Sequence, residues 1–181
     1  MRALVVYESM YGNTRLVASR IADGLRSRYD VTVVPVAEAT GELVAAADLL
    51  IVGGPTHMHR MSTAASRQMA AAAAGKDGSG LVMDAGADGP GVREWLLSLP
   101  RAGNHQLAVA FDTRLSGVPA FTGRASRGIS RMLTKHGYRP LMAPQSFLVG
   151  KRNTLADGEQ ARARQWGTTI GGLACLQQVA A

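Results

Sequence analysis

The sequence predicts a single α/β domain over residues 1–181, with a parallel β-sheet covered by helices on both faces. Five short apolar runs recur along the chain, and segments with helical spacing separate them. The runs are almost continuously apolar, as expected for strands that are buried on both faces. Since strands and helices alternate, we expect right-handed crossovers and a doubly wound sheet. A length of 181 residues is enough to bury one core.

The apolar runs define the expected strands in chain order. Four of them are only four to six residues long, which is the usual length of a buried strand. The fifth is the least regular, because it is expected to begin near Arg139 and to end with residues 147–149. The other four expected strands cover residues 3–7, 31–36, 49–52 and 107–111.

Four segments between and after the strands carry apolar residues at intervals of three and four, which predicts amphipathic helices. Pro100 helps to end the second of them. Segment 41–47 leaves room for only a short helix, and the Gly- and Asp-rich segment 75–91 is expected to be a surface excursion. The apolar positions of the four helices are Val17, Ile21 and Leu25; Trp95, Leu96 and Leu99; Ala125, Ile129, Met132, Leu133 and His136; and Ala163, Trp166, Ile170, Leu173 and Leu176.

The composition favours a cytoplasmic protein. A single cysteine, Cys175, excludes an internal disulfide framework and fits a reducing compartment. No stretch resembles a signal peptide or a membrane span, since the N-terminal apolar run has only the length of a strand. The net charge of +7 and the pI near 10.3 favour an acidic partner.

Basic residues recur along one side of the helix expected near residues 125–136. Arg124, Arg127, Arg131 and Lys135 are spaced by three or four residues, opposite the apolar stripe. Two interpretations stay open: a solvated helix face, or a docking surface for an acidic protein or nucleic acid. Nucleic acid is the less favoured partner, because the sequence has no reading-helix motif and no aromatic-interleaved basic ribbon.

The turn after the first strand is the strongest functional signal, and it reads Glu8-Ser9-Met10-Tyr11-Gly12-Asn13-Thr14. Gly12 permits close backbone approach, and Ser9, Asn13 and Thr14 can donate to phosphate oxygens at the positive end of a helix. The Gly-Lys-Ser/Thr loop of nucleotide-binding proteins and the three-glycine dinucleotide fingerprint are both absent. A phospho-receiver aspartate and a phosphatase cysteine loop are absent as well. A structural alternative, in which these side chains only cap the helix, stays open.

This turn resembles the phosphate loop of the flavodoxin family, usually Ser/Thr-x-Thr-Gly-x-Thr, with Tyr11 in place of the second hydroxyl residue. The resemblance extends over nearly the whole chain in strand order, turn position and length. It is closest to the flavodoxin-domain proteins of high-GC bacteria, such as actinobacteria, and more distant to flavodoxin-like quinone reductases. It implies a five-stranded sheet of order 2-1-3-4-5 and FMN as the ligand. The implied phosphate contacts are Ser9, Met10, Tyr11, Gly12, Asn13 and Thr14.

Two later loops, residues 53–62 and 112–119, are expected to hold the flavin ring, because ligands bind at the switch point of such a sheet. Gly53 and Gly54 should let the backbone approach the ring, and Pro55 should stiffen the end of the strand. Neither loop has an aromatic residue in its middle, so stacking should be weak. Whether a second subunit completes the site, as in quinone-reductase homo-oligomers, stays open. The ring contacts that the resemblance implies are Pro55, Thr56, His57, Met58, Asp112, Thr113, Arg114 and Gly117.

The sequence His57-Met58-His59 does not predict a metal site. No cysteine is nearby, His136 lies in a helix, and His105 precedes the fourth strand at the opposite end of the sheet. We therefore expect no metal. His57 is instead the one side chain that we name as a proton donor.

The predicted function is electron transfer by an FMN-dependent oxidoreductase or carrier. Arg60, Arg114 or a protonated His57 would stabilise the negative charge of a fully reduced ring, which favours a two-electron reductase over a low-potential carrier. Electrons would pass from NAD(P)H or a partner reductase to a quinone-like or protein acceptor. The alternative is a flavin-free protein-interaction module, which Tyr11 and the missing aromatics favour. Fold analogy does not decide between them.

Overall fold

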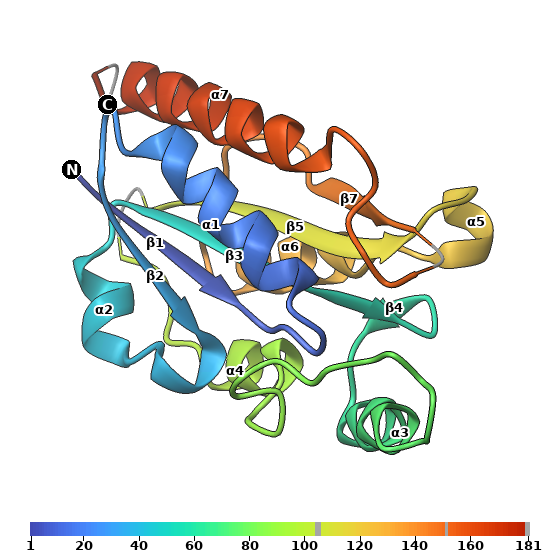
Figure 1. The fold of residues 1–181 in the computed structure, drawn as a ribbon. Coiled ribbons are helices and arrows are strands. Elements are labelled where there is room, and N and C mark those ends of the chain that lie inside the picture. The colour runs from blue at the N-terminus through green and yellow to red at the C-terminus, as the bar shows by residue number, and fades with distance from the viewer. Residues whose placement is uncertain (104–105, 151, 180–181) are drawn as a thin grey trace.

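The chain folds into a twisted parallel sheet with helices on both faces (Figure 1). This computed structural model describes residues 1–103, 106–150 and 152–179, so the prediction for His105 lies outside the described residues. The strands are β1 (Arg2–Tyr7), β2 (Asp30–Pro35), β3 (Leu49–His57), β5 (Leu107–Leu115), β6 (Arg139–Pro140) and β7 (Gln145–Val149). Their order is β2-β1-β3-β5-β6, and β7 also pairs with β5. The expected order 2-1-3-4-5 is confirmed, because β6 and β7 share the fifth position.

Two apolar layers fill the space between the sheet and the helices. One face is covered by α1 (Asn13–Leu25) and α7 (Glu159–Val179). The other face is covered by α2 (Gly41–Ala46), α4 (Val92–Ser98) and α6 (Ala125–Lys135). In β1, Ala3 and Val5 belong to the first layer, whereas Leu4 and Val6 belong to the second. This division explains why the strand is apolar throughout its length.

A glycine contact brings α1 and α7 together. A Cβ on Gly24 would lie 2.1 Å from the carbonyl oxygen of Arg164. A Cβ on Gly167 would lie 2.1 Å from the carbonyl oxygen of Ile21. Because no larger side chain fits between these backbones, the contact fixes α1 against α7. The N-terminus of α1 then lies at the carboxyl end of β1.

The fifth strand position is divided. A single strand from Arg139 to residue 149 is wrong, because residues 141–144 separate β6 from β7. The amide of Leu141 still donates to the carbonyl oxygen of Ala108 at 3.0 Å, so the chain follows β5 beyond β6. Pro144 lacks an amide donor and cannot continue the ladder.

The third and fourth strand positions are longer than expected. β3 runs to His57 and β5 runs to Leu115, so both supposed ring loops begin as strand. At Met58 and His59, which have φ angles of 44° and 73°, β3 turns back into the antiparallel β4 (Arg60–Met61).

Three helical segments were not predicted: the 3-10 turn η1 (Val36–Glu38), α3 (Ala64–Ala74) and the short α5 (Pro119–Thr122). α3 is rich in alanine and has no apolar stripe, but a capping box between Thr63 and Ser66 starts it. In α7, Leu173 and Leu176 are 39% and 71% exposed, so their prediction as core positions is wrong. As predicted, residues 75–91 form no helix or strand.

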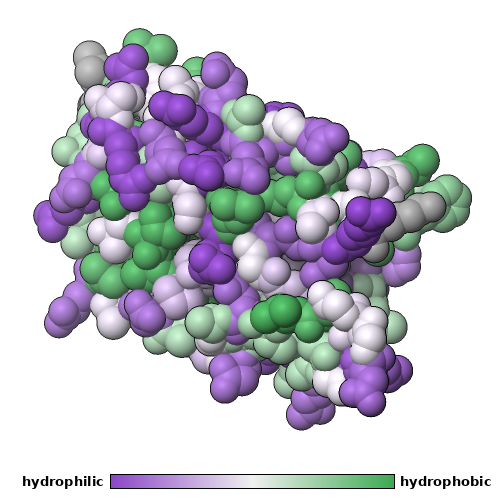
Figure 2. Space-filling model, viewed as in Figure 1, coloured by the Kyte–Doolittle hydropathy of each residue, from purple (hydrophilic) through white to green (hydrophobic). Residues whose placement is uncertain are grey.

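The surface over α7 is largely hydrophilic, and hydrophobic residues show at the tip where α5 projects as well as in patches at the left and centre of this face (Figure 2). No helix in the described part of the chain is long and apolar enough to cross a membrane.

Candidate functional site

The turn after β1 presents the N-terminus of a 13-residue helix at the carboxyl edge of the sheet. Gly12 occupies the cap position with φ 88° and ψ −19°, a left-handed conformation that favours glycine. The Ser9 hydroxyl accepts a hydrogen bond from the Gly12 amide at 3.1 Å. The side chain of Ser9 therefore shapes the turn, and the amides of the first turn of α1 are left facing outward.

A cavity of about 270 Å³ adjoins this turn, and we call it the strand-end cavity. It lies where β3, β5 and β7 end and where α1 and α3 approach them. Nine of the predicted site residues line it: Met10, Tyr11, Asn13, Thr14, Pro55, Thr56, His57, Thr113 and Arg114. Residues from the phosphate turn and from both predicted ring segments are thus brought together, although they are far apart in the sequence.

The polar side chains of the cavity are paired with the protein itself. The hydroxyls of Thr14 and Thr113 are 2.8 Å apart. The Asn13 amide donates to the carbonyl oxygen of Asn153 at 2.9 Å, and the Tyr11 hydroxyl donates to the carbonyl oxygen of Ala70 at 2.9 Å. These bonds link α1 to β5, to the segment after β7 and to α3.

Gly53 and Gly54 serve the core rather than a ligand. A Cβ on Gly53 would lie 2.1 Å from Cζ of Phe111, and a Cβ on Gly54 would lie 2.9 Å from Cγ1 of Val92. Both glycines are buried inside β3. The expectation that they let the backbone approach a flat ring is therefore wrong.

The other five predicted site residues do not line the cavity: Ser9, Gly12, Met58, Asp112 and Gly117. Met58 is 72% exposed at the tip of the β3–β4 hairpin. The buried Asp112 carboxylate accepts a hydrogen bond from the Ser126 amide at 2.7 Å, and so caps α6. Burial raises the pKa of this carboxyl group.

In the described part of the chain, Arg114 is the one basic arginine or lysine side chain that lines the cavity. Its Nη1 donates to the carbonyl oxygen of Gly117 at 2.9 Å, to the Thr122 hydroxyl at 2.8 Å and to the carbonyl oxygen of Leu115 at 3.2 Å. These bonds fold the segment between β5 and α5 around the guanidinium group. Arg114 keeps its charge, because a guanidinium does not deprotonate in proteins.

His57 is partly buried in the lining of the cavity. Burial lowers the pKa of its imidazole, a hydrogen bond that the ring donates to the Ser66 backbone acts against this, and the charge of Arg67 lowers the pKa further. The neutral imidazole is therefore the dominant form at neutral pH. The expectation that a protonated His57 supplies a second positive charge is not supported.

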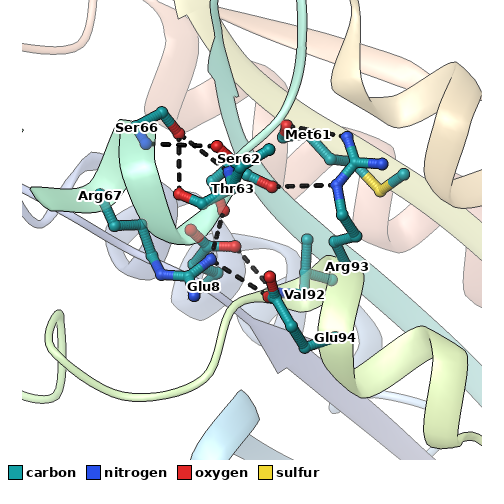
Figure 3. A network of polar contacts seen from close by, with 9 residues as sticks. All are labelled: Glu8, Met61, Ser62, Thr63, Ser66, Arg67, Val92, Arg93 and Glu94. Atoms are coloured by element: carbon teal, nitrogen blue, oxygen red, sulfur yellow. Dashed lines mark hydrogen bonds and ion pairs between the residues drawn. The ribbon is translucent and has the colours of Figure 1, made fainter. Parts of the chain in front are cut away.

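A second polar network lies beneath the turn and holds α3 and α4 to β1 (Figure 3). The Glu8 carboxylate accepts a hydrogen bond from the Val92 amide at 2.8 Å. Nη1 of Arg67 donates to the Ser62 hydroxyl at 3.2 Å and to the Glu94 carboxylate at 3.1 Å. Burial raises the pKa of Glu8. This network fixes the elements behind the cavity without lining it.

Sequence reasoning missed four lining residues: Ala70, Leu115, Val149 and Asn153. Asn153 carried a signal, because it follows the last strand and the carboxyl ends of parallel strands share one edge. Ala70 carried no signal of its own. The capping pattern of Thr63 and Ser66 marks the start of α3, but this helix was not predicted. Among the described residues, no group of three or more histidine, cysteine, aspartate or glutamate side chains is placed to hold a metal ion.

The parallel order of the sheet, with a cavity at its carboxyl edge, defines a flavodoxin-like fold. A family model described as a flavodoxin domain matches residues 4–69, which include most of β1, the turn, α1, β2, β3 and the first half of α3. The resemblance predicted from the turn is thereby confirmed. No curated protein sequence matches the chain significantly.

Solved structures share the fold over nearly their whole length. A flavodoxin from the domain Archaea is 20% identical, with a TM-score of 0.64 over 96% of this chain and 99% of that chain. A flavodoxin from Streptococcus pneumoniae TIGR4 is 20% identical, with a TM-score of 0.63 over 95% and 99%. A WrbA-like flavodoxin from Agrobacterium tumefaciens is 18% identical, with a TM-score of 0.58 over 97% and 98%. At these identities the similarity establishes the fold.

Proposed function

We propose that the strand-end cavity binds FMN and that the protein passes electrons from this flavin to a quinone-like or protein acceptor. The observation that carries the proposal is the junction of a left-handed Gly12, the N-terminus of α1 and the cavity. The first-turn amides of α1 have no acceptor within the helix, and the positive end of its dipole favours a phosphate monoester. The flavodoxin-domain match over this turn supports the same ligand.

The size of the cavity indicates that binding requires some opening. Its volume of about 270 Å³ lies just below the range of roughly 300–1,000 Å³ that is usual for ligand pockets. The bonds from Tyr11 to Ala70 and from Asn13 to Asn153 span the cavity. We expect both bonds to break when FMN enters, which releases the Tyr11 hydroxyl and the Asn13 amide as donors for the ligand.

FMN supplies the redox chemistry when it is bound, and the chain supplies position and charge. Arg114 is the one charged side chain that lines the cavity, and no carboxylate lines it among the described residues. Arg60 faces a separate hollow. The positive charge that favours a two-electron reductase over a low-potential carrier therefore comes from Arg114. The neutral His57 is the candidate proton donor or relay at the ring.

Exposed apolar side chains lie on segments next to residues that line the cavity, and they suit an apolar acceptor or a partner protein. Met58 and Phe121 are 72% and 78% exposed, and Leu115 and Val118 are 62% and 60% exposed. All four lie on the hairpin tip or on the segment that Arg114 holds in place. We propose a cytoplasmic setting, where NAD(P)H or a partner reductase supplies the electrons.

The test is titration of flavin-free protein with FMN, followed by flavin fluorescence, in two variants of α3. Ala70→Phe fills the cavity, whereas Ala71→Phe adds the same ring to the adjacent exposed position. We expect wild type and Ala71→Phe to bind FMN equally, and Ala70→Phe to bind at least about tenfold more weakly. Equal binding by both variants would contradict the site. Absence of binding to wild type would favour the flavin-free interaction module.

A further inference from the structure

A second and larger hollow, of about 750 Å³, lies on the other side of the β3–β4 hairpin. Thr56 and His57 line the strand-end cavity, whereas His59, Arg60 and Met61 line this hollow. The bridge between His59 and Gly123 forms part of the wall between them. Since the two spaces are separated by backbone, a ligand in one does not require a ligand in the other.

Five arginines converge on this space, which we call the arginine hollow. Arg60 comes from β4, Arg93 from α4, Arg124 from the cap of α6, and Arg127 and Arg131 from α6 itself. No carboxylate lines the hollow, and none of the ion pairs observed among the described residues includes any of these five side chains. The hollow is therefore a concentration of positive charge without a counter-charge.

The guanidinium groups are partly positioned for an anion. Nε and Nη2 of Arg93 donate to the carbonyl oxygens of Ser62 and Met61, both at 3.1 Å, which holds the group still and leaves other N–H donors unused (Figure 3). Nε of Arg124 is buried without an acceptor. A buried donor without a partner is costly, and the Arg124 side chain also lines the hollow.

Repulsion between the arginine side chains of α6 also favours a bound anion. Arg127 and Arg131 are four residues apart, so they lie on one side of the helix, and like charges at this spacing are destabilising. Arg124 lies one turn before Arg127 on the same side. A bound polyanion would turn this repulsion into paired, charge-assisted hydrogen bonds, for which arginine is better shaped than lysine.

The shape of the hollow favours a small ligand over a macromolecule. Gly128 lies between the arginines of α6, and a Cβ there would lie 3.0 Å from Cε of Met61. The absence of a side chain at this position keeps the floor deep. Pro119, Ala120 and the buried Met61 give the hollow an apolar side. Apolar residues next to guanidinium groups suit a ligand with an apolar base and phosphate groups.

We propose that the arginine hollow binds a nucleotide that carries two or more phosphate groups. The phosphates pair with Arg93, Arg124, Arg127 and Arg131, and the base packs on Pro119 and Ala120. This site does not depend on the proposed function of the strand-end cavity. A pyridine nucleotide and an adenine nucleotide share this chemistry: the first would serve as electron donor to the neighbouring cavity, and the second as a regulator.

Calorimetric titration of the full chain with ADP, ATP, NADPH and adenosine tests the proposal. The double variant Arg127→Gln/Arg131→Gln removes two exposed charges from the hollow. Its matched control, Arg28→Gln/Arg164→Gln, removes two exposed charges from the α1–α7 side. We expect wild type and the control to bind ADP or NADPH equally, and the double variant to bind at least about tenfold more weakly. Adenosine should not bind. Tighter binding of NADPH than of ATP would identify the ligand as a pyridine nucleotide that donates electrons. Tighter binding of ATP would identify it as an adenine nucleotide that regulates the protein.

Three outcomes would overturn the proposal: no binding of any phosphorylated nucleotide to wild type, equal binding by both double variants, or tighter binding of a short DNA duplex than of ATP. The Ala70→Phe variant separates the two sites. It should lose FMN but keep ADP, so a failure of FMN binding leaves the test of the arginine hollow intact. Loss of ADP binding in Ala70→Phe would instead show that the nucleotide enters the strand-end cavity.

Discussion

The two hollows on either side of the β3–β4 hairpin differ in how they present polar groups. Among the described residues, the strand-end cavity contains one charged side chain, and Nη1 of Arg114 is already bonded to its own loop. The arginine hollow contains five arginines without a carboxylate. The first space can select a ligand by shape and by backbone amides, whereas the second selects by charge. The two spaces therefore allow the shape and charge contributions to binding to be measured separately in one protein.

A substitution that disrupts the bridge between His59 and Gly123, which forms part of the wall between the two hollows, should give the largest effect. Gly123 has φ 77°, and a Cβ there would lie 2.1 Å from Cα of His59. Gly123→Val should lower the free energy of unfolding by about 2 kcal/mol or more, because the clash and the strained backbone add. Both ligands should then bind more weakly. Urea denaturation measures the first effect, and titration measures the second.

The control for this prediction is Gly41→Ala, since a Cβ on Gly41 would meet nothing within 4 Å. It should leave stability and both affinities near those of wild type. If Gly123→Val were as stable as Gly41→Ala, the hairpin and the α5 segment would not form a common wall.

The next largest effect should be that salt weakens ligand binding in the two hollows to different extents. Raising the salt from about 50 mM to about 500 mM shortens the screening length several-fold, and should weaken nucleotide binding in the arginine hollow by about tenfold or more. FMN binding should change by less than about threefold, because neutral donors hold its phosphate. Parallel titrations at the two salt concentrations provide the measurement. An equal loss for both ligands would contradict the distinction between shape and charge.

A smaller effect is expected from Arg114→Lys. Lysine keeps the charge but cannot bond to the carbonyl oxygens of Leu115 and Gly117 and to Thr122 with the geometry of one guanidinium. We expect FMN to bind about fivefold more weakly, with nucleotide affinity unchanged. Arg60→Lys, which changes a residue of the other hollow, is the matched control. Equal FMN affinity in the two variants would mean that Arg114 does not order the cavity.

The smallest effect concerns pH and stability. Burial lowers the pKa of His57 below its ordinary value of 6.5, so the unfolded chain binds a proton that the folded chain resists. The stability that His57 contributes is complete above about pH 6.5 and is lost as the pH falls below it. His57→Gln should therefore lose less stability than wild type between about pH 7.5 and about pH 5.5 in urea denaturation. An identical loss in both proteins would contradict the burial of the imidazole.

Much of the fold could be predicted because burial leaves a pattern in the sequence. β1 is apolar at every position from Ala3 to Val6, and the stripe of Val17, Ile21 and Leu25 is fully buried in α1. α3 could not be found in this way, because an alanine-rich helix at the edge of the molecule has no apolar stripe. The division of the fifth strand depends on the local effect of Pro144, which a hydrophobic pattern does not record.

The candidate site was predicted where it depends on chain order, and missed where it depends on side-chain direction. Thr56 and Thr113 lie near the carboxyl ends of the neighbouring strands β3 and β5, so their convergence follows from topology. Asp112 lies next to Thr113, yet its carboxylate turns toward α6 and caps it. Gly53 resembles a ligand-binding glycine in sequence, but its missing side chain makes room for Phe111. In each case the role of the residue depends on which face of the strand it occupies. The sequence pattern did not show this, because β3 and β5 extend beyond the apolar runs that predicted them.

The central claim is that the turn after β1 grips a phosphate while the strand-end cavity holds the attached ring. Fluorescence titration of flavin-free protein with FMN and with riboflavin, which lacks the phosphate, tests this claim most directly. We expect FMN to bind with quenching of its fluorescence, and riboflavin to bind at least about tenfold more weakly. Equal affinity for the two flavins, or binding of neither, would contradict it.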